Sequence, residues 1–369
     1  MARDNALYGL IYRHRLIAKQ ALGAAVRLLP VRSGRWLRNL AEQIAFRAVP
    51  EYQGDTLPPI FHYWSSRYVS PRLKRLGAGR PEDLYLVEIL RRAEALDGPV
   101  RIASFGSGSC ALELSLATML RDRGVAADIE CIDFNSSLMQ GAEENARALG
   151  LSEYMRFTVA DCNSHAGDGG RDVIVVNQFL HHVENLEGFC SALKRALAPE
   201  GVLLTSDLIG RNGHLPWPAV DAIVQAHWDA LSPSQMFDRY FGRQQKQYVG
   251  IDHAAYSNEG IRAQDIVGCL LEAFDFRVFV TYGGAIMPFV ERRIGFNFDR
   301  EDPADRAFID RVAEADDAAI ASGEYPASNM FAVLCHRGLA RERHHDPVSP
   351  EQHVAATRSQ LALAGNSTH

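Results

Sequence analysis

The sharpest local signal in this chain is Ser104-Phe105-Gly106-Ser107-Gly108-Ser109-Cys110-Ala111. These residues follow an apolar, β-rich run and open a stretch with helical spacing. The two glycines permit a tight turn and let a ligand approach the backbone, while the first turn of the helix presents free N–H groups. The string also fits the G-x-G-x-x-A form of the dinucleotide fingerprint, although such a turn can occur without a ligand. The motif therefore predicts a strand–turn–helix unit that is a candidate for binding a nucleotide-like ligand.

Short β-rich runs alternate with helical stretches on both sides of this motif. The predicted strands are Val100–Phe105, Ala127–Ile132, Met155–Val159, Asp172–Val176 and Val202–Ser206, with later ones at Phe276–Tyr282 and Asn329–Cys335. The predicted helices are Ala111–Asp122, Ser137–Leu149, Leu186–Ala198 and Glu259–Phe274, the last capped by Ser257 or Asn258. This alternation is typical of βαβ units and a parallel sheet.

Acidic and amide side chains stand where three of these strands end. Asp133 ends the second strand, Asp161 follows the third and Asn177 ends the fourth. All three would lie at the carboxyl edge of one sheet, where open α/β sheets bind ligands. A carboxylate at 133 suits ribose hydroxyls, and one at 161 suits the amino group of an adenine. The alternatives are a helix cap for Asp133 and a surface turn for Asp161.

The glycine motif and these strand ends resemble a class I S-adenosylmethionine-dependent methyltransferase over about residues 98–210. The family usually has an acidic residue and three glycines here, whereas this chain has Ser104 at the acidic position and Cys110 at the third glycine. The resemblance implies S-adenosylmethionine as cofactor. It implies a cofactor site formed by Ser104, Phe105, Gly106, Gly108, Asp133, Phe134, Asn135, Asp161, Cys162, Asn177 and Gln178.

The resemblance also implies the fold class. It is α/β, with a Rossmann-like sheet of seven strands in the order 3-2-1-4-5-7-6 and strand 7 antiparallel. The five early and two late strand candidates agree with this arrangement. A nicotinamide dehydrogenase is the alternative for the first half, because a glycine-rich turn is shared between folds. A dehydrogenase would not need a helix and two strands of this kind at the end.

Three regions are expected along the chain. Residues 1–95 would form a basic, helical N-terminal cap, and residues 96–337 the methyltransferase domain. An aromatic-rich segment at about 211–256 would be an inserted helical lid, its aromatic residues serving packing more than substrate binding. Residues 338–369 show little apolar pattern and are expected to be a loose C-terminal tail.

Histidines are the catalytic candidates. His181 and His182 follow the fourth strand, at the position that borders the methyl group in the family, and His214 lies in the loop after the fifth strand. A hydroxyl acceptor needs a base near neutral pH, which is the usual role of histidine. Each of these residues can instead be a packed or capping histidine. Their spacing is neither HxxxH nor HxH, so no metal site is expected. His253, before the late helix, is a further histidine candidate, and Glu184 and Asp207 are weaker ones.

Composition narrows the class of protein. The chain has 369 residues, of which 47% are hydrophobic and 23% charged, which is typical of a globular protein. Its net charge of −6 argues against a nucleic-acid partner. The six cysteines form no CxxC pair, which argues against a disulfide framework and favours the cytoplasm. Neither a signal peptide nor an apolar run of the roughly 18–20 residues needed for a membrane span is recognisable.

The first 50 residues differ from the rest in charge. They contain nine Arg or Lys and two Asp or Glu, a net charge of +7, on stretches with helical spacing. This surface would suit peripheral contact with a membrane or an anionic substrate, or it is the solvated face of a helical cap. The oligomeric state stays open, with a homodimer as one alternative.

The expected function is methyl transfer to a small-molecule, glycan or lipid-linked acceptor, first of all at oxygen. The Asn-Pro-Pro-Tyr signature of base-N methyltransferases is replaced by Asn177-Gln178-Phe179-Leu180, which lowers the odds of a nucleic-acid substrate. The alternatives are a methyltransferase of protein or RNA, and a non-catalytic scaffold with the same fold.

Overall fold

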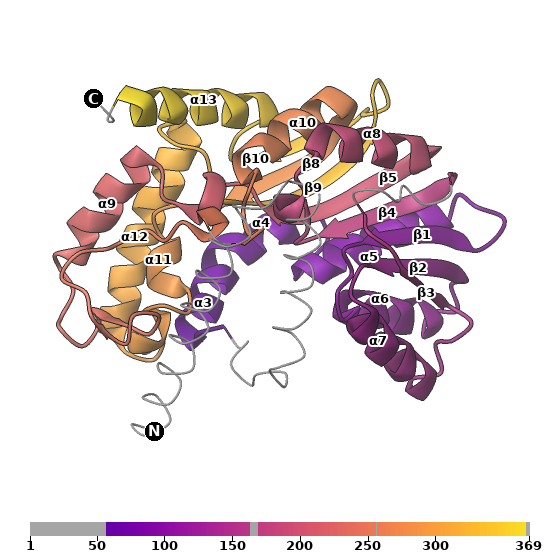
Figure 1. Cartoon of the computed structure of the whole chain (residues 1–369), viewed down its shortest axis with the longest axis horizontal. Helices are drawn as coiled ribbons and strands as arrows, with labels where there is room; N and C mark the ends of the chain where they lie inside the picture. Colours follow the sequence, from indigo (N-terminus) through magenta and orange to yellow (C-terminus); the bar gives the residue numbers. More distant parts are fainter. Residues whose placement is uncertain (1–56, 163–168, 256, 367–369) are drawn as a thin grey trace, which may run out of the picture.

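A computed structural model describes residues 57–162, 169–255 and 257–366 as three layers, with one mixed sheet between two layers of helices (Figure 1). The sheet has eight strands: β1 (Val100–Phe105), β2 (Ala127–Asp133), β3 (Met155–Val159), β4 (Arg171–Asn177), β5 (Leu197–Leu208), β8 (Phe274–Tyr282), β9 (Asn329–His336) and β10 (His344–Asp346). Their order is β3-β2-β1-β4-β5-β9-β8-β10. Strand β9 is antiparallel to both neighbours, and the other pairings in this sheet are parallel.

The predicted strand order is thus confirmed, with β8 as the sixth strand and β9 as the seventh. The expected count of seven is one too low, because β10 adds a short parallel strand beside β8. The class is the Rossmann-like α/β fold that the family resemblance implies, and its βαβ units are those that the alternation of strands and helices predicts.

Both faces of the sheet are apolar because successive side chains of a strand point to opposite faces. In β4, Val173 and Val175 join one core and Ile174 and Val176 the other. The first core includes helices α5 (Pro81–Ala93), α6 (Ala111–Arg121) and α7 (Ser136–Ala148). The second includes α8 (Leu186–Ala196), α10 (Ile266–Ala273) and residues packed under α13 (Pro350–Asn366).

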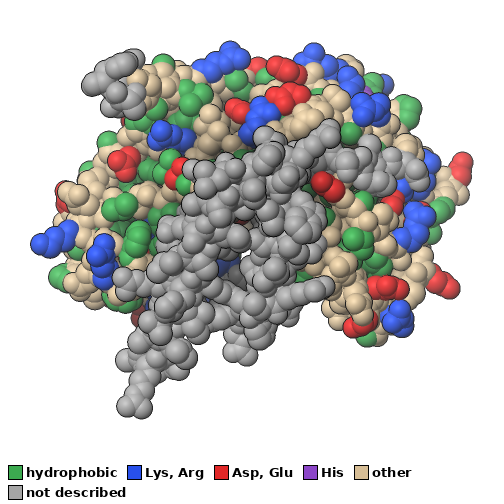
Figure 2. Space-filling model, in the orientation of Figure 1, with side chains coloured by type: hydrophobic (Ala, Val, Ile, Leu, Met, Phe, Trp, Pro, Cys, Tyr) green, Lys and Arg blue, Asp and Glu red, His purple; other side chains and the backbone are tan. Residues whose placement is uncertain are grey.

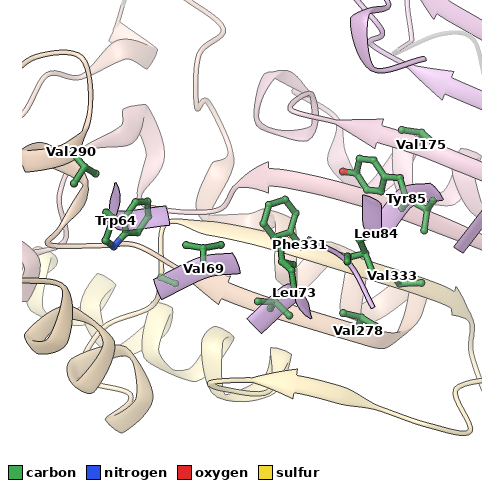
Figure 3. Packing of buried hydrophobic residues seen from close by; sticks show 14 of the residues in the cluster. Trp64, Val69, Leu73, Leu84, Tyr85, Val175, Val278, Val290, Phe331 and Val333 are labelled. Carbon is green, nitrogen blue, oxygen red and sulfur yellow. The ribbon is translucent and has the colours of Figure 1, made fainter. Parts of the chain in front are cut away.

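Besides α5, other described residues of the N-terminal region cover the face of the sheet that carries the first core. Helices α3 (Pro59–Trp64) and α4 (Ser70–Lys74) flank a π-helical turn at Ser65–Val69. The first core contains Trp64, Val69 and Leu73 from this region together with Phe331 and Val333 of β9 (Figure 3). The +7 segment lies outside the described residues, so its expected membrane contact stays a prediction.

A helical lobe lies beside the end of the sheet and is built largely from two insertions (Figure 1). The first insertion contains α9 (Pro218–Trp228) and the hairpin β6 (Phe237–Asp238) and β7 (Arg243–Gln244). The second contains α11 (Met287–Val290) and α12 (Pro303–Ser322). Short 3₁₀ turns occur at Leu180–His182, Asn212–His214, His253–Ala255, Ala263–Asp265 and Gly295–Asn297.

The first insertion corresponds to the expected lid. Trp217 and Trp228 are each 1% exposed and belong to the core. The Trp228 indole also donates to the Gln245 carbonyl, 2.9 Å away. Packing therefore explains these two aromatic residues, while a lid motion stays a prediction.

Two expectations about the later chain are wrong. The predicted helix at Glu259–Phe274 begins only at Ile266, after Gly260 takes a positive φ of +67° and interrupts helical geometry. The described part of the tail is not loose, because it forms β10 and α13. Helix α13 is held to the insertion by Gln360, whose Oε1 accepts from the Ala219 N–H at 3.2 Å.

Basic and acidic side chains are interspersed on the described surface of the face in Figure 2. Among the described residues, no helix combines the length and hydropathy that a membrane span requires.

The buried His353 of α13 makes stability depend on pH. Its side chain is buried, neither ring nitrogen has a hydrogen-bond partner, and the Phe279 ring lies edge-on to it. Burial lowers the pKa of His353 to about 3, against about 6.5 in the unfolded chain. The unfolded state therefore binds the proton first, and stability is lost as the pH falls below about 6.5. The loss reaches about 2 kcal/mol at pH 5.

We expect His353→Leu to remove this loss and to raise stability at neutral pH, because it also removes two unpaired polar atoms. Denaturant unfolding at pH 7.5 and pH 5 measures both effects. The exposed His62→Leu is the matched control and should keep the wild-type dependence. An equal fall in stability for wild type and His353→Leu would contradict the assignment.

Candidate active site

The predicted site residues gather at the carboxyl ends of the parallel strands. Phe105 pairs with Ile132, Asp133 with Val159, and Asn177 with Ser206, so the ends of β1 to β5 are aligned along one edge. The loop from β1 to α6 crosses this edge. The alignment follows from the parallel register of the sheet and not from any contact close in sequence.

The glycine loop needs its two glycines for different reasons. Gly106 has φ +68°, and a Cβ there would lie 2.1 Å from the Phe179 ring, so this ring closes over the backbone. Gly108 has φ +54°, and nothing lies within 4 Å of the place where its Cβ would be. Cys110 also adopts a positive φ, 56°, as it caps α6. The loop thus leaves open space over Gly108 and none over Gly106.

Ser104 and Glu113 form a buried pair behind the loop. The Ser104 hydroxyl donates to Glu113 Oε1 at 2.6 Å, and the two residues are 1% and 3% exposed. Burial raises the pKa of Glu113, and the hydrogen bond from Ser104 opposes the rise. The chain therefore places a carboxyl group beside Ser104 from the first turn of α6. Phe105 contributes its backbone only, since its ring packs edge-on against Phe189 in the core.

Asp133 organises the second strand end. Its Oδ2 accepts from the Gly108 N–H at 2.9 Å and its Oδ1 from the Asn135 N–H at 2.8 Å. Burial raises its pKa, and hydrogen bonds from the backbone of Asn135, Gly108 and Phe134 oppose the rise. The Asn135 side chain caps α7 by accepting from the N–H groups of Ser137 and Leu138. Asp133 therefore links the glycine loop to the start of α7.

The remaining predicted cofactor residues lie along the same edge. Asp161 is partly exposed and immediately precedes Cys162, a buried thiol whose pKa burial raises to about 12. Asn177 Oδ1 accepts from the hydroxyl of the buried Tyr85 at 3.0 Å. Gln178 takes a positive φ of 51°, and its side-chain amide donates to Ser206. Asn177 and Gln178 are therefore anchored by helix α5 and strand β5.

His181 is fixed by a buried carboxylate. Its Nδ1 lies 2.6 Å from Asp207 Oδ1, and the two side chains are 4% and 0% exposed. Asp207 Oδ2 also accepts from the Phe179 and Leu180 N–H groups, at 3.0 and 2.7 Å. Asp207 thus holds both the ring and the turn that carries it.

Glu259 brings the three predicted histidines together. Its Oε1 lies 3.2 Å from His181 Nε2 and 3.0 Å from His214 Nε2, and its Oε2 lies 3.7 Å from His182 Nε2. The four residues come from the turn after β4, the turn after β5 and the segment before α10. We call His181, His182, His214 and Glu259 the histidine cluster. The His253 ring centroid is 6.0 Å from that of His214.

Charges within the histidine cluster shift its pKa values. Burial lowers the pKa of His181, but Asp207 and Glu259 outweigh it and raise the pKa to about 10. Burial and the charge of His181 lower the pKa of His182 to about 4. Burial raises the pKa of Glu259, yet hydrogen bonds from His181 and His214 hold it well below its usual range.

Two contributors lie outside the predicted site, and a third is only a weak candidate in the sequence. The sequence pattern places Glu259 in the first turn of a helix, and nothing in it singles out Tyr85. Asp207 is the weak candidate. A strand-end position was the signal for Asp207, whereas no local pattern reveals that Glu259 faces histidines from two distant turns.

The Gly106 site provides a test of the loop geometry. We expect Gly106→Ala to destabilise the fold by about 2–4 kcal/mol, because the new Cβ meets the Phe179 ring and the positive φ strains alanine. Thermal or denaturant unfolding measures the change. Gly141→Ala in α7 is the control, since its Cβ meets nothing within 4 Å, and it should be neutral or stabilising by up to about 1 kcal/mol. Equal effects of the two substitutions would contradict the loop geometry.

Known proteins that resemble this chain indicate its family. Residues 104–205 match a family model described as a methyltransferase domain. A non-reducing polyketide synthase of Penicillium shearii is 27% identical over 176 residues, covering 46% of this chain and 8% of the synthase. Citrinin polyketide synthase of Monascus ruber is 24% identical over 138 residues, covering 37% of this chain and 5% of the synthase. The chain thus aligns with less than a tenth of either relative.

Solved structures with related folds include two methyltransferases. The CMeT domain of citrinin polyketide synthase has a TM-score of 0.36 and 15% identity, covering 73% of this chain and 56% of that one. Geranyl diphosphate C-methyltransferase from Streptomyces coelicolor A3(2), solved with S-adenosyl-L-homocysteine among its ligands, has a TM-score of 0.37 and 13% identity, covering 69% and 82%.

The match to the family model falls on β1 to β5, where the glycine loop, Asp133 and Asn177 lie. The strand order, with its antiparallel seventh strand, extends the same fold beyond the matched residues. Residues 104–205 therefore match a methyltransferase domain, and the strand order around them is the one that the resemblance to class I S-adenosylmethionine-dependent methyltransferases implies.

Proposed function

We propose that the chain transfers the methyl group of S-adenosylmethionine to a small-molecule acceptor activated by losing a proton next to a carbonyl group. The observation that carries this proposal is the histidine cluster. It lies beside Asn177, where the turn after β4 leaves the ligand-binding edge of the sheet.

The residues at the edge fit the cofactor. The open space over Gly108 can accept a ligand close to the backbone, and free N–H groups of α6 face the same loop. The Asp133 carboxylate is suited to bind the ribose hydroxyls of the cofactor. Asp161 would bind its adenine, and Asn177 would lie beside its methionine part. S-adenosylmethionine supplies an electrophilic methyl group on a sulfonium. The chain must hold the acceptor in line with it and exclude water.

The histidine cluster suits activation of an acceptor. The side chains of His181, His214 and Glu259 converge at one place. There the imidazole N–H groups would donate to the acceptor's oxygen, and the Glu259 carboxylate would position both rings. His182 is the imidazole that is left to take the proton, since its Nε2 is 3.7 Å from Glu259 and one third of its side chain is exposed. Asp207 keeps His181 in position. General-base assistance of this kind contributes about 10²–10⁴ in rate.

Carbon is the acceptor atom that we favour. The curated relatives are polyketide synthases, and a polyketide chain carries acidic C–H groups between two carbonyls. Oxygen, the first expectation from the sequence, is the second candidate, because the same histidines suit removal of a phenolic or activated hydroxyl proton. The small-molecule or glycan nature of the acceptor, a cytoplasmic location, a homodimer and independence from nucleic acid remain predictions.

Isotope-labelled S-adenosylmethionine tests the proposal. The full chain is incubated with a labelled methyl donor and two acceptor series, β-ketoacyl thioesters and phenols of similar size. We expect label on the carbon between the carbonyls, identified by mass spectrometry and by the carbon chemical shift of the new methyl group. Label on the phenol oxygen alone would favour the second candidate. Binding of S-adenosylmethionine without transfer in either series would overturn the proposed acceptor chemistry.

A further inference from the structure

We propose that the histidine cluster is a metal site, in which one divalent, nitrogen-seeking ion such as Zn²⁺ binds between His181 Nε2, His214 Nε2 and Glu259 Oε1. The sequence argued against a metal because the histidines lack the spacing of a local ligand motif. The fold brings ligands from three separate segments to one point, which spacing cannot reveal. Across residues 57–162, 169–255 and 257–366, this is the group of three ligand-type side chains whose donor atoms all lie within 4.8 Å of one another.

The distances between donors fit a coordinated ion. Glu259 Oε1 is 3.2 Å from His181 Nε2 and 3.0 Å from His214 Nε2. Donors at about 2.0–2.2 Å from one ion lie about 2.9 Å apart at right angles and about 3.4 Å apart at a tetrahedral angle. Both distances fall within this interval. These two distances are compatible with a shared ion, and the third pair of donors, His181 Nε2 and His214 Nε2, lies within 4.8 Å.

His181 has the support that a metal-binding histidine needs. Its Nδ1 donates to the buried Asp207 Oδ1 at 2.6 Å, and its Nε2, which gives up its proton when an ion binds, is directed at Glu259. Asp207 is itself fixed by N–H groups of Phe179, Leu180 and Leu208. A carboxylate on the far nitrogen fixes the tautomer and orientation of a metal-binding imidazole and strengthens it as a ligand.

The backbone around His214 is shaped for its ring. His214 has a positive φ of 57°, an uncommon conformation for histidine that concentrates at functional sites. The ring lies against the backbone of Gly260, where an added Cβ would be 2.9 Å from the ring carbon Cε1. The Gly213 N–H donates to the Gly260 carbonyl at 2.9 Å, which ties the turn of His214 to the segment of Glu259. The hydrogen bond between Gly213 and Gly260 therefore holds the two neighbouring ligands, His214 and Glu259, close together.

The donor set selects the class of ion. Two imidazoles and one carboxylate suit Zn²⁺ and its transition-metal neighbours, whereas Mg²⁺ and Ca²⁺ prefer oxygen ligands. Three protein ligands leave coordination positions for an acceptor. Glu259 and His214 are 36% and 20% exposed at their side chains, so the site is accessible from solvent. The role of the ion rests on the proposed function: it would hold and polarise the carbonyl oxygen of the acceptor.

Cobalt provides a spectroscopic test on the full chain. The protein is dialysed against a chelator and titrated with Co²⁺, whose visible absorption reports coordination, and Zn²⁺ is then added as competitor. We expect one Co²⁺ per chain, displaced by Zn²⁺ and not by Mg²⁺. His214→Ala and Glu259→Gln should each weaken binding at least about tenfold, and Asp207→Asn about 10–100-fold. The exposed His62→Ala is the matched control and should bind as wild type does.

The outcomes separate this site from the proposed function. Binding of S-adenosylmethionine by each variant shows that the fold and the cofactor site are intact. Equal Co²⁺ binding by wild type, His214→Ala and Glu259→Gln would overturn the metal site, because the ion then binds elsewhere. Absence of Co²⁺ and Zn²⁺ binding by a wild type that binds S-adenosylmethionine would overturn it too. The contacts of Glu259 with His181 and His214 would then be hydrogen-bonded ion pairs only.

Discussion

Replacing Asp133 by alanine should weaken S-adenosylmethionine binding about 100-fold. The carboxylate lies at the end of β2, 7% exposed, and accepts from the backbone of Gly108 and Asn135. We expect it to accept from the cofactor's ribose as well, and hydrogen bonds to a charged group are worth about 1.5–3 kcal/mol each. The substitution also frees the Gly108 N–H, so the glycine loop loses its link to α7. Equilibrium dialysis with labelled cofactor measures the affinity.

Asp128 offers a matched control for this prediction. It lies on the same strand but pairs with Arg156 on the exposed surface, 2.8 Å away. Asp128→Ala should leave the affinity within about twofold of wild type, because an exposed ion pair contributes about 0–1 kcal/mol to stability. An Asp133→Ala protein that melts like wild type and keeps its affinity would show that the cofactor does not bind at the β2 edge.

Replacing His181 by alanine should lower the rate of methyl transfer about 10²–10³-fold while leaving cofactor affinity nearly unchanged. His181 is the best-fixed member of the histidine cluster, held between Asp207 and Glu259. Its loss removes a group that positions the acceptor's oxygen, and loss of one such group costs about 2.7–4 kcal/mol in the transition state. Asp133 lies on another strand, so the cofactor site should keep its contacts.

Single-turnover kinetics at saturating S-adenosylmethionine measure this effect, and calorimetry checks the affinity. His62→Ala again serves as the control, since its exposed side chain lies on α3, far from the strand ends in sequence. A His181→Ala protein that turns over at the wild-type rate would remove His181 from the activation of the acceptor. A variant that loses cofactor binding would instead place His181 in the cofactor site.

The central sheet was predictable because its signals are local. β-rich runs alternate with helical stretches along 100–208, a glycine turn follows the first run, and polar residues stand at the ends of the next three. Parallel pairing then brings distant strand ends to one edge, so Asp133 and Asn177 fell in the expected place. The antiparallel seventh strand came from the family resemblance, and the structure confirms it.

Tertiary contacts explain what the sequence did not show. Glu259 looked like the first residue of a helix, but the positive φ of Gly260 turns the chain there and directs the carboxylate to two histidines. The tail has few apolar residues, yet Val348 and Ala356 are buried and His345 pairs with Phe279 in the register of β10 and β8. Such short elements gain stability from packing on an existing sheet, which periodicity alone does not reveal.

Calorimetric titration of the full chain with S-adenosylmethionine tests whether the glycine loop and the β2 edge bind the cofactor. We expect one binding site per chain, competition by S-adenosylhomocysteine, and loss of the signal in Asp133→Ala with Asp128→Ala unaffected. A wild-type chain that unfolds cooperatively on heating, yet binds neither molecule, would contradict the assignment of the glycine loop and the β2 edge as a cofactor site.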